Sequence, residues 1–293
     1  MFNATVSTKF FGLMGNPLGQ SAAAFIHNSV YQKMGIDALY VPLEMEMADL
    51  GPAIENMEKF NYAGSGVTMP FKTQAHKYLD GLADSARHSQ VVNTIAIDGE
   101  GRKIGHNTDG TGFVLSLKEQ LGLKIPDHKY LILGSGGAAT AIACALGAEG
   151  AKFIRSLCLG RDYFCAETLF ERVEPHFPGV CGIGEMTDRT IAQGLEECDV
   201  IIHATKVGMF PETEAMLFEA DLLKPNHVVC DVVYVPVDTM LLREAAKRGC
   251  TTLSGLWMNI NQAAEQMRLW LGIDPPLDFM YQCGLEYLDK KGK

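Results

Sequence analysis

Two short polar stretches carry residue types that can move a proton. In Val67-Thr68-Met69-Pro70-Phe71-Lys72 a proline ends an apolar run, and a lysine stands two residues after it. The dipole of a helix disfavours a lysine in its first turn, so Lys72 is a candidate for another role, although an ordinary solvated lysine is the alternative. In Asn107-Thr108-Asp109-Gly110, Asp109 can orient a cation or simply cap the helix that follows. Neither stretch identifies a reaction by itself.

A third stretch has the pattern of a nucleotide-binding turn. Four apolar residues, 130–133, precede Gly134-Ser135-Gly136-Gly137-Ala138 and an alanine-rich segment. Glycines let the backbone approach a pyrophosphate, and the free N–H groups of a helix N-terminus then face the anion. The context of strand, glycine turn and helix predicts dinucleotide binding, with a tight turn that holds no ligand as the alternative.

The next predicted strand ends before Gly160-Arg161-Asp162, and Asp162 follows Gly134 by 162 − 134 = 28 residues. An acid at this position can bind ribose hydroxyls, while an arginine can stack on adenine or pair with a 2′-phosphate. The two together leave the choice between NAD and NADP open. A solvated surface pair is the alternative.

Apolar runs alternate with helix-like periodic segments along most of the chain, which predicts an α/β fold with parallel sheets. The expected strands are 9–14, 39–43, 66–69, 93–97, 103–106, 130–133, 153–159, 199–203 and 227–233. The expected helices are 22–34, 48–60, 71–79, 137–149, 163–177, 238–248 and 261–271. The turn Asp98-Gly99-Glu100-Gly101 predicts a hairpin between two of the strands.

Composition narrows the class of protein. The 293 residues favour two domains, and 47% apolar with 20% charged residues is typical of a folded chain. A net charge of −10 disfavours general nucleic-acid binding and anionic membrane surfaces. The sequence has no apolar run long enough for a membrane span and no signal-peptide pattern. The eight cysteines form no Cys-x-x-Cys pair, so we expect reduced thiols, no metal site and a cytoplasmic location.

Nine motifs in one order resemble the shikimate dehydrogenase family, from about Phe11 to Gly272. They are Gly15-Asn-Pro-Leu with Ser21; His27-Asn28; Val67-Thr68-x-Pro70-x-Lys72; Val92-Asn93-Thr94; Asn107-Thr108-Asp109-Gly110; Gly134-x-Gly136-Gly137-Ala138; Ala204-Thr205-x-x-Gly208-Met209; Tyr234-x-Pro236-x-x-Thr239; and Gly255-x-x-Met258-x-x-x-Gln262. The chain is most similar to the quinate/shikimate dehydrogenase subclass, on Gly64, Gly66, Val67, Lys206 and Arg161-Asp162. That resemblance favours NAD, with NADP also accepted.

The resemblance implies a fold and a set of partners. The substrate-binding domain would span residues 1–108 and be completed by 259–293, and a Rossmann-like domain would span 109–258. The partner would be a small-molecule substrate, without nucleic acid or membrane. The protein would be a monomer or a homodimer.

The resemblance also implies roles for single residues. Lys72 would be the general acid/base, and Asp109 would orient it and hold a ring hydroxyl. The remaining substrate groups would contact Ser21, Thr68, Asn93, Tyr234 and Gln262. The cofactor would contact Gly134, Ser135, Gly136, Gly137, Ala138, Arg161, Asp162, Thr205, Lys206, Met209, Val232, Gly255 and Met258. The reaction would be hydride transfer between a nicotinamide and a ring hydroxyl of a polyhydroxy cyclohexane or cyclohexene carboxylate, such as quinate or shikimate.

One motif departs from the family pattern. Ser21-Ala22-Ala23-Ala24 stands where the family has Ser-x-Ser/Thr-Pro, so one carboxylate-binding hydroxyl is missing. Losing a hydrogen bond to a charged group costs about 1.5–3 kcal/mol, which is roughly 10- to 100-fold in affinity. Ala23 therefore keeps open a family member that acts on another cyclitol or an amino analogue. A dinucleotide-binding protein without turnover is a second alternative, against which the retained Lys72 and Asp109 argue.

Overall fold

The computed structural model describes residues 4–19 and 21–292; residues 1–3, Gln20 and residue 293 lie outside the described part. The chain divides into two compact units. Unit 1 comprises Met1–Thr108 and Gln262–Gly292, and unit 2 comprises Asp109–Asn261. The divisions fall inside α4 (Thr108–Leu121) and α9 (Gly255–Leu271). Which unit binds substrate and which binds cofactor stays a prediction.

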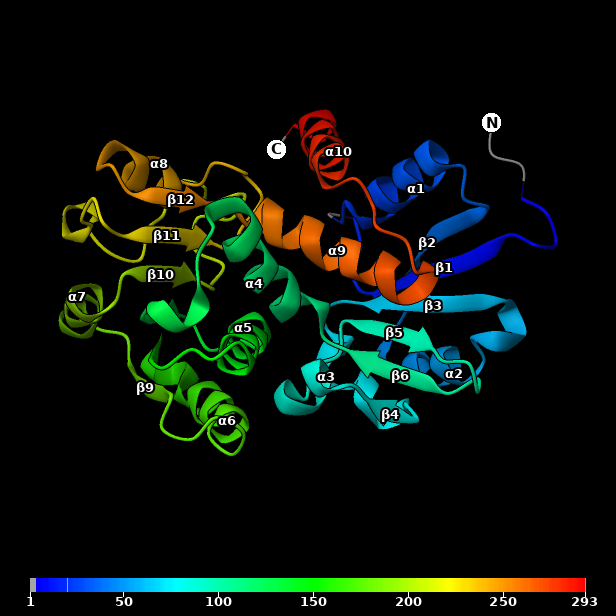
Figure 1. Ribbon diagram of the computed structural model, residues 1–293, viewed down its shortest axis with the longest axis horizontal. Helices are drawn as coiled ribbons and strands as arrows, with labels where there is room; N and C mark the ends of the chain where they lie inside the picture. The colour runs from blue at the N-terminus through cyan, green and yellow to red at the C-terminus, as the bar shows by residue number, and fades with distance from the viewer. Residues whose placement is uncertain (1–3, 20, 293) are drawn as a thin grey trace. The chain divides into compact units, whose positions relative to one another are not determined.

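Unit 1 is built on a mixed sheet with the strand order β2-β1-β3-β5-β6-β4 (Figure 1). Its strands are β1 (Lys9–Gly15), β2 (Ala38–Glu44), β3 (Tyr62–Val67), β4 (Gly81–Leu82), β5 (Thr94–Ile97) and β6 (Lys103–His106). β1 runs parallel to β2 and β3, whereas β5 is antiparallel to β3 and β6. The expected hairpin is confirmed, and its turn closes with a bond from the Gly101 N–H to the Asp98 carbonyl at 3.0 Å.

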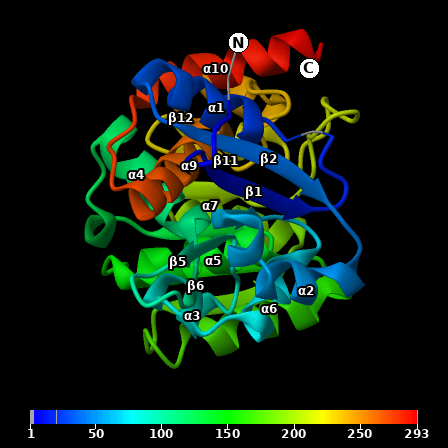
Figure 2. The ribbon, with the colours of Figure 1, turned by 90° about the vertical axis from the view of Figure 1, so that its right-hand side faces the viewer.

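Helices cover both faces of this sheet. On one face α2 (Leu50–Glu55) and α3 (Asp84–Ser89) close a core that includes Met14, Ile54 and Phe71. Elsewhere in the unit Phe11 stacks on Trp270 of α9, with ring centroids 4.9 Å apart. α1 (Ala23–Met34) lies beside α10 (Leu277–Lys290), as Figure 2 shows.

Unit 2 is a doubly wound parallel sheet with the order β12-β11-β10-β7-β8-β9. Its strands are β7 (Tyr130–Leu133), β8 (Ile154–Cys158), β9 (Cys181–Glu185), β10 (Val200–His203), β11 (Val228–Asp231) and β12 (Thr251–Leu253). After β7 the chain moves outward to β8 and β9, then crosses to β10 on the other side of β7. In such sheets ligands bind at the carboxyl ends of the strands where the order reverses. The expected α/β class is confirmed.

The strands of unit 2 alternate between two cores because successive side chains point to opposite faces. Tyr130 and Ile132 pack with α4, α5 (Gly137–Ala148) and α6 (Tyr163–Val173). Leu131 and Leu133 pack with α7 (Asp188–Glu197) and α8 (Met240–Lys247). A sheet buried on both faces explains why its central strands β7, β10 and β11 are almost continuous apolar runs in the sequence.

Several expected elements are wrong in extent or type. The helix expected over 48–60 is only α2, flanked by the 3-10 turns Met47–Asp49 and Glu58–Phe60, because Asn56 ends it with a side-chain bond to the Pro52 carbonyl. The strand expected over 66–69 is β3, which begins and ends earlier. α9 begins at Gly255 instead of residue 261. β4, β9, β12, α3, α7 and α10 were not expected from the pattern.

The helix expected over 71–79 is also wrong, and this changes an argument about Lys72. The segment forms two short 3-10 turns, Phe71–Thr73 and Ala75–Tyr78. A three-residue turn has little cumulative dipole. The helix dipole therefore gives no reason to single out Lys72, and the argument for it depends on the motif alone.

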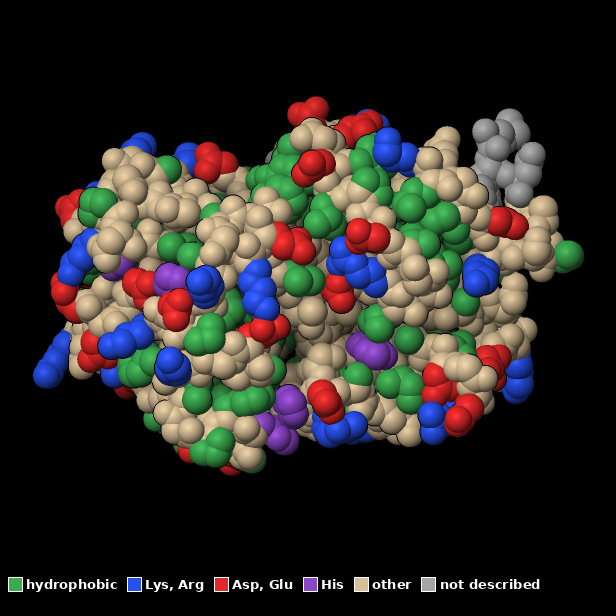
Figure 3. Space-filling model, viewed as in Figure 1, with side chains coloured by type: hydrophobic (Ala, Val, Ile, Leu, Met, Phe, Trp, Pro, Cys, Tyr) green, Lys and Arg blue, Asp and Glu red, His purple; other side chains and the backbone are tan. Residues whose placement is uncertain are grey.

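On the surface shown in Figure 3, acidic and basic side chains are interspersed instead of gathered by sign. No helix within the described residues is long and apolar enough to cross a membrane. The eight cysteines are free thiols, and seven of them are buried, with Cys165 exposed.

Candidate functional site

The glycine turn of unit 2 leaves room beside a helix N-terminus. Gly134 has φ +122°, and a Cβ there would lie 2.6 Å from the Ala204 carbonyl oxygen, so the turn requires glycine. Gly136 is the N-cap of α5 and Gly137 its first residue, and a Cβ on either would meet nothing within 4 Å. The exposed backbone at a helix N-terminus fits a pyrophosphate. These residues therefore fit a dinucleotide.

Arg161 and Asp162 lie at the same edge of the sheet as this turn. β8 pairs in parallel with β7, and a 3-10 turn, Gly160–Asp162, follows β8. The two side chains are 81% and 52% exposed, and Nε of Arg161 lies 3.8 Å from a carboxylate oxygen of Asp162. A pair this exposed is weakly held, so either group is able to turn toward a ligand.

The connections after β10 and β11 carry further predicted cofactor residues at this edge. Lys206 is exposed, Met209 is 40% exposed and Val232 is half-buried. A Cβ on Gly255 would lie 2.5 Å from the Val232 carbonyl oxygen, so the backbones at these two positions nearly touch. Met258 is mostly buried in the core of unit 2, so little of it is exposed to a ligand.

In unit 1 three predicted polar positions form a hydrogen-bonded group. Asn93 is buried; its side-chain Oδ1 accepts the Thr108 N–H at 2.7 Å, and its side-chain Nδ2 donates to Thr108 Oγ1 at 2.9 Å. Thr108 Oγ1 also donates to Gln262 Oε1 at 3.4 Å. Much of the hydrogen-bonding capacity of Asn93 thus fixes the chain just before Asp109, and its role toward a substrate stays a prediction.

Lys72 is tied to this group through the backbone. Its carbonyl accepts the Val92 N–H at 2.8 Å, and Val92 directly precedes Asn93. Thr68 is held by a bond from its N–H to the Met14 carbonyl at 2.9 Å. Lys72 and Thr68 are both half-buried, which suits side chains that must meet both protein and ligand.

The start of α1 holds the altered substrate motif. Ser21 Oγ accepts the Ala23 N–H at 3.3 Å, and the N-cap residue Ala22 has no side chain to cap the helix. The first turn of α1 therefore has few side-chain acceptors of its own.

Two more predicted residues belong to unit 2. Asp109 is the second residue of α4 and is 8% exposed, and Tyr234 is half-buried in the connection after β11. Gly110 allows close packing there, since a Cβ on it would lie 2.3 Å from the Ala141 carbonyl oxygen. The pairing of Asp109 with Lys72 stays a prediction.

Sequence reasoning missed two polar residues at the same sheet edge. His203 ends β10 and Asp231 ends β11, and both side chains are buried and bonded to each other. A signal was present, because each is the polar residue near the end of an otherwise apolar run.

Comparisons with family models and with known proteins match this chain to one family. Residues 13–95 match the family model of the shikimate dehydrogenase substrate binding domain, and residues 255–282 match that of the shikimate 5′-dehydrogenase C-terminal domain. A relative from Alkaliphilus oremlandii named shikimate dehydrogenase (NADP(+)) is 36% identical over 278 residues, covering 94% of this chain and 96% of the relative.

Comparison with solved structures finds proteins of similar fold along nearly the whole chain. Shikimate 5-dehydrogenase from Listeria monocytogenes, in complex with shikimate and NAD, has a TM-score of 0.89 at 35% identity and covers 95% of this chain and 96% of its own. A 5-ketofructose reductase of Gluconobacter sp. strain CHM43 has 0.88 at 30%, covering 97% and 100%. Quinate dehydrogenase from Corynebacterium glutamicum, in complex with NAD, has 0.85 at 28%, covering 95% and 99%. The family expected from the motifs is thus confirmed: the chain belongs to the shikimate dehydrogenase family.

Proposed function

We propose that this protein is an NAD(P)-dependent oxidoreductase of the shikimate/quinate dehydrogenase type. It transfers hydride between a nicotinamide and a ring hydroxyl of a polyhydroxy cyclohexane or cyclohexene carboxylate. The observation that carries the proposal is that a member of this family keeps both Lys72 and Asp109, together with the open glycine turn at the start of α5. That combination also argues against a dinucleotide-binding protein without turnover.

The proton of the reacting hydroxyl must leave as hydride departs, and Lys72 is the proposed acceptor. A lysine serves as a general acid/base when it can be neutral for part of its cycle, and a nearby carboxylate orients it. We assign the orienting role to Asp109. Thr68, Asn93, Tyr234, Gln262 and Ser21 would hold the other ring substituents, and a site built to hydrogen-bond several hydroxyls rejects analogues that lack them.

The cofactor supplies the hydride acceptor, and we propose NAD as the preferred form. Asp162 at the end of β8 suits the two ribose hydroxyls of NAD, whereas Arg161 suits the 2′-phosphate of NADP. Both are exposed, and the relatives include an NADP-named enzyme and NAD complexes, so NADP is accepted as well.

A carboxylate can be held without the missing hydroxyl. The first turn of α1 has no side-chain cap from Ala22, and N–H groups at a helix N-terminus attract anions. This supports a ring carboxylate as substrate, bound more weakly than where two hydroxyls are present.

Ala23 favours a second candidate, a dehydrogenase of another cyclitol or an amino analogue. A protein of the same fold is named 5-ketofructose reductase, so the fold alone does not fix the substrate.

The test is the absorbance of reduced nicotinamide after mixing the protein with NAD or NADP and one of quinate, shikimate or other cyclitols. Signal with quinate or shikimate supports the first candidate. Signal only with another ring alcohol supports the second. Dinucleotide binding with no reduction across the panel would contradict both.

A further inference from the structure

A buried histidine–aspartate pair lies at the carboxyl edge of the sheet in unit 2. His203 and Asp231 are the last residues of β10 and β11 and stand opposite each other in the parallel register. Their side chains are 3% and 1% exposed, and Nδ1 of His203 lies 2.8 Å from Oδ1 of Asp231. Because Asp231 accepts, Nδ1 carries the proton.

The histidine reaches the connection after β10. Its Nε2 lies 2.6 Å from Thr205 Oγ1, and Thr205 Oγ1 accepts the Val207 N–H at 3.1 Å. Since the Thr205 oxygen already accepts the Val207 N–H, its own hydroxyl hydrogen is assigned to the contact with Nε2. His203 thereby fixes the start of the segment that contains Lys206.

The aspartate reaches the connection after β11. Its Oδ1 also accepts the Val233 N–H at 2.9 Å, and its Oδ2 accepts the Thr239 hydroxyl at 2.7 Å. Thr239 is the N-cap of α8, where its side chain accepts the Leu242 N–H. The pair therefore ties together the two connections that carry Thr205, Val232 and Tyr234.

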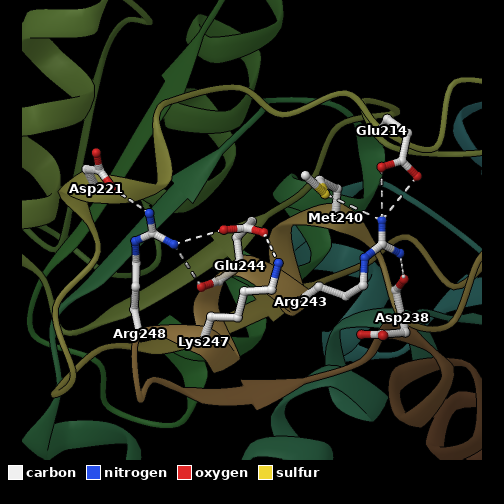
Figure 4. Close-up of polar contacts among 8 residues, drawn as sticks. All are labelled: Glu214, Asp221, Asp238, Met240, Arg243, Glu244, Lys247 and Arg248. Atoms are coloured by element: carbon white, nitrogen blue, oxygen red, sulfur yellow. Dashed lines mark hydrogen bonds and ion pairs between the residues drawn. The ribbon is translucent and has the colours of Figure 1, made fainter.

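The later part of the connection after β10 is held differently. In Figure 4, Arg243 of α8 bonds Glu214 at 3.1 Å, and Arg248 bonds Glu244 at 2.9 Å and also Asp221. The carboxylates of Glu214 and Asp221 are 73% and 90% exposed. Exposed ion pairs contribute little, whereas removing one member of a buried pair is costly. The buried His203–Asp231 pair is therefore the stronger of these side-chain restraints; through Thr205 it acts on the start of residues 205–209, beside the backbone bond from the Met209 N–H to the Lys206 carbonyl at 3.1 Å.

We propose that His203 is a positioning residue for the cofactor. Acting through Thr205, it holds residues 205–209 in the conformation that binds a nicotinamide dinucleotide. The inference rests on the proposed function, because it assumes that this segment contacts that ligand.

The experiment is a calorimetric titration of NAD and of NADP into the full-length protein and its variants. We expect His203→Ala and Thr205→Val each to raise the Kd about tenfold, the factor that corresponds to one lost hydrogen bond. The double variant should lose no more than either single one, because both changes remove the same contact. Thr205→Ser keeps the hydroxyl and should bind within about twofold of the wild type.

His227→Gln is the matched control. His227 is also buried in unit 2 and bonded through both ring nitrogens, to the Lys224 N–H at 3.1 Å and the Leu195 carbonyl at 3.0 Å. It precedes β11, at the opposite end of the strand from Asp231. We expect its replacement to lower the Tm without changing the Kd.

The outcomes separate the two proposals. A wild-type protein that binds neither dinucleotide overturns the proposed function. A wild type that binds, with an unchanged Kd in His203→Ala, overturns the positioning role, as do additive losses in the double variant or an equal loss in His227→Gln. If His203→Ala does not fold, His203→Asn replaces it in the same titration, and its Kd is judged by the same criteria.

Discussion

Two buried histidines, one in each unit, are used in opposite ways. His203 has a partner on both ring nitrogens, and its partner Asp231 accepts three hydrogen bonds. His27 of α1 has one close hydrogen bond, between Nδ1 and the Ala23 carbonyl at 2.8 Å; among the described residues its Nε2 has no partner within hydrogen-bond distance, and the Gln266 side chain is only near enough to raise the pKa of His27 slightly. The first histidine organises loops, and the second is packed into a core.

The surroundings explain the difference. His203 stands at a strand end, where connections supply N–H and hydroxyl groups. His27 stacks on Tyr40, with ring centroids 4.1 Å apart, and the hydroxyls of Tyr31 and Tyr40 and Oε1 of Gln266 also have no hydrogen-bond partner in the described part of the chain. Unpaired buried polar groups cost free energy, so the surroundings of His27 are less favourable than the fully bonded His203–Asp231 site.

The largest expected effect separates chemistry from cofactor binding. Lys72→Ala should lower kcat by about 100- to 10,000-fold, because a general acid/base contributes a factor of that size. Lys72 belongs to unit 1, so the Kd of the dinucleotide should stay nearly unchanged. Steady-state kinetics and calorimetry check this. A comparable loss of cofactor binding would mean that the catalytic residue is misplaced.

Removing the Asp231 carboxylate, which accepts three hydrogen bonds, should be the most destabilising of these changes. Asp231→Ala would leave the His203 Nδ1–H, the Val233 N–H and the Thr239 hydroxyl buried without an acceptor. We expect the free energy of unfolding to fall by about 3–5 kcal/mol. Denaturant unfolding measures it, and a loss under about 1 kcal/mol would remove the contrast between the two histidine sites.

His27 should make stability depend on pH. Burial lowers its pKa to about 4, against smaller opposing effects of the Ala23 carbonyl and the Gln266 side chain. Between that pKa and the ordinary value of 6.5 the unfolded chain binds more protons than the folded one, so stability falls as pH falls. From about pH 7 to about pH 5 the contribution lost is about 2 kcal/mol.

The measurement is denaturant unfolding of the wild type and His27→Phe at both pH values. Burial also lowers the pKa of His106 and His227, so the variant keeps other contributions of the same sign. We therefore expect the free energy of unfolding to depend less steeply on pH in His27→Phe than in the wild type. Equal slopes would show that His27 does not titrate in this range.

Deleting a buried hydroxyl that has no hydrogen-bond partner among the described residues should not lower the free energy of unfolding. Tyr40→Phe removes a buried hydroxyl whose oxygen lies 2.6 Å from where a Cβ on Gly66 would stand. We expect the free energy of unfolding to change by less than about 1 kcal/mol, toward greater stability. A clear destabilisation in thermal unfolding would show that the hydroxyl is satisfied after all, for instance by a buried water.

The last prediction concerns cofactor preference. Asp162→Ala should raise the Kd of NAD by about three- to tenfold and leave that of NADP less affected, because an exposed carboxylate contributes about one hydrogen bond. Parallel titrations of both dinucleotides check it. Equal weakening, or none, would mean that Asp162 does not reach the ribose.

The glycine-rich strand shows why some boundaries escaped sequence reasoning. Gly64, Ser65 and Gly66 have little intrinsic strand preference, so the strand was expected to begin only at residue 66. In the structure Trp270 and Tyr40 occupy the space that side chains at Gly64 and Gly66 would fill. The strand is stabilised by residues far along the chain, which a local window does not contain.

The sequence by itself determined the α/β class, the hairpin, the glycine turn and the family, because these follow from local periodicity, turn chemistry and ordered motifs. Only the tertiary structure decided that His203 meets Asp231, that Asn93 is bonded to Thr108, and that His27 is buried among tyrosines. Those contacts depend on strand register and on which faces pack together. Both are set by the whole core, since burying apolar area and pairing backbone groups is a global optimum that no single segment specifies.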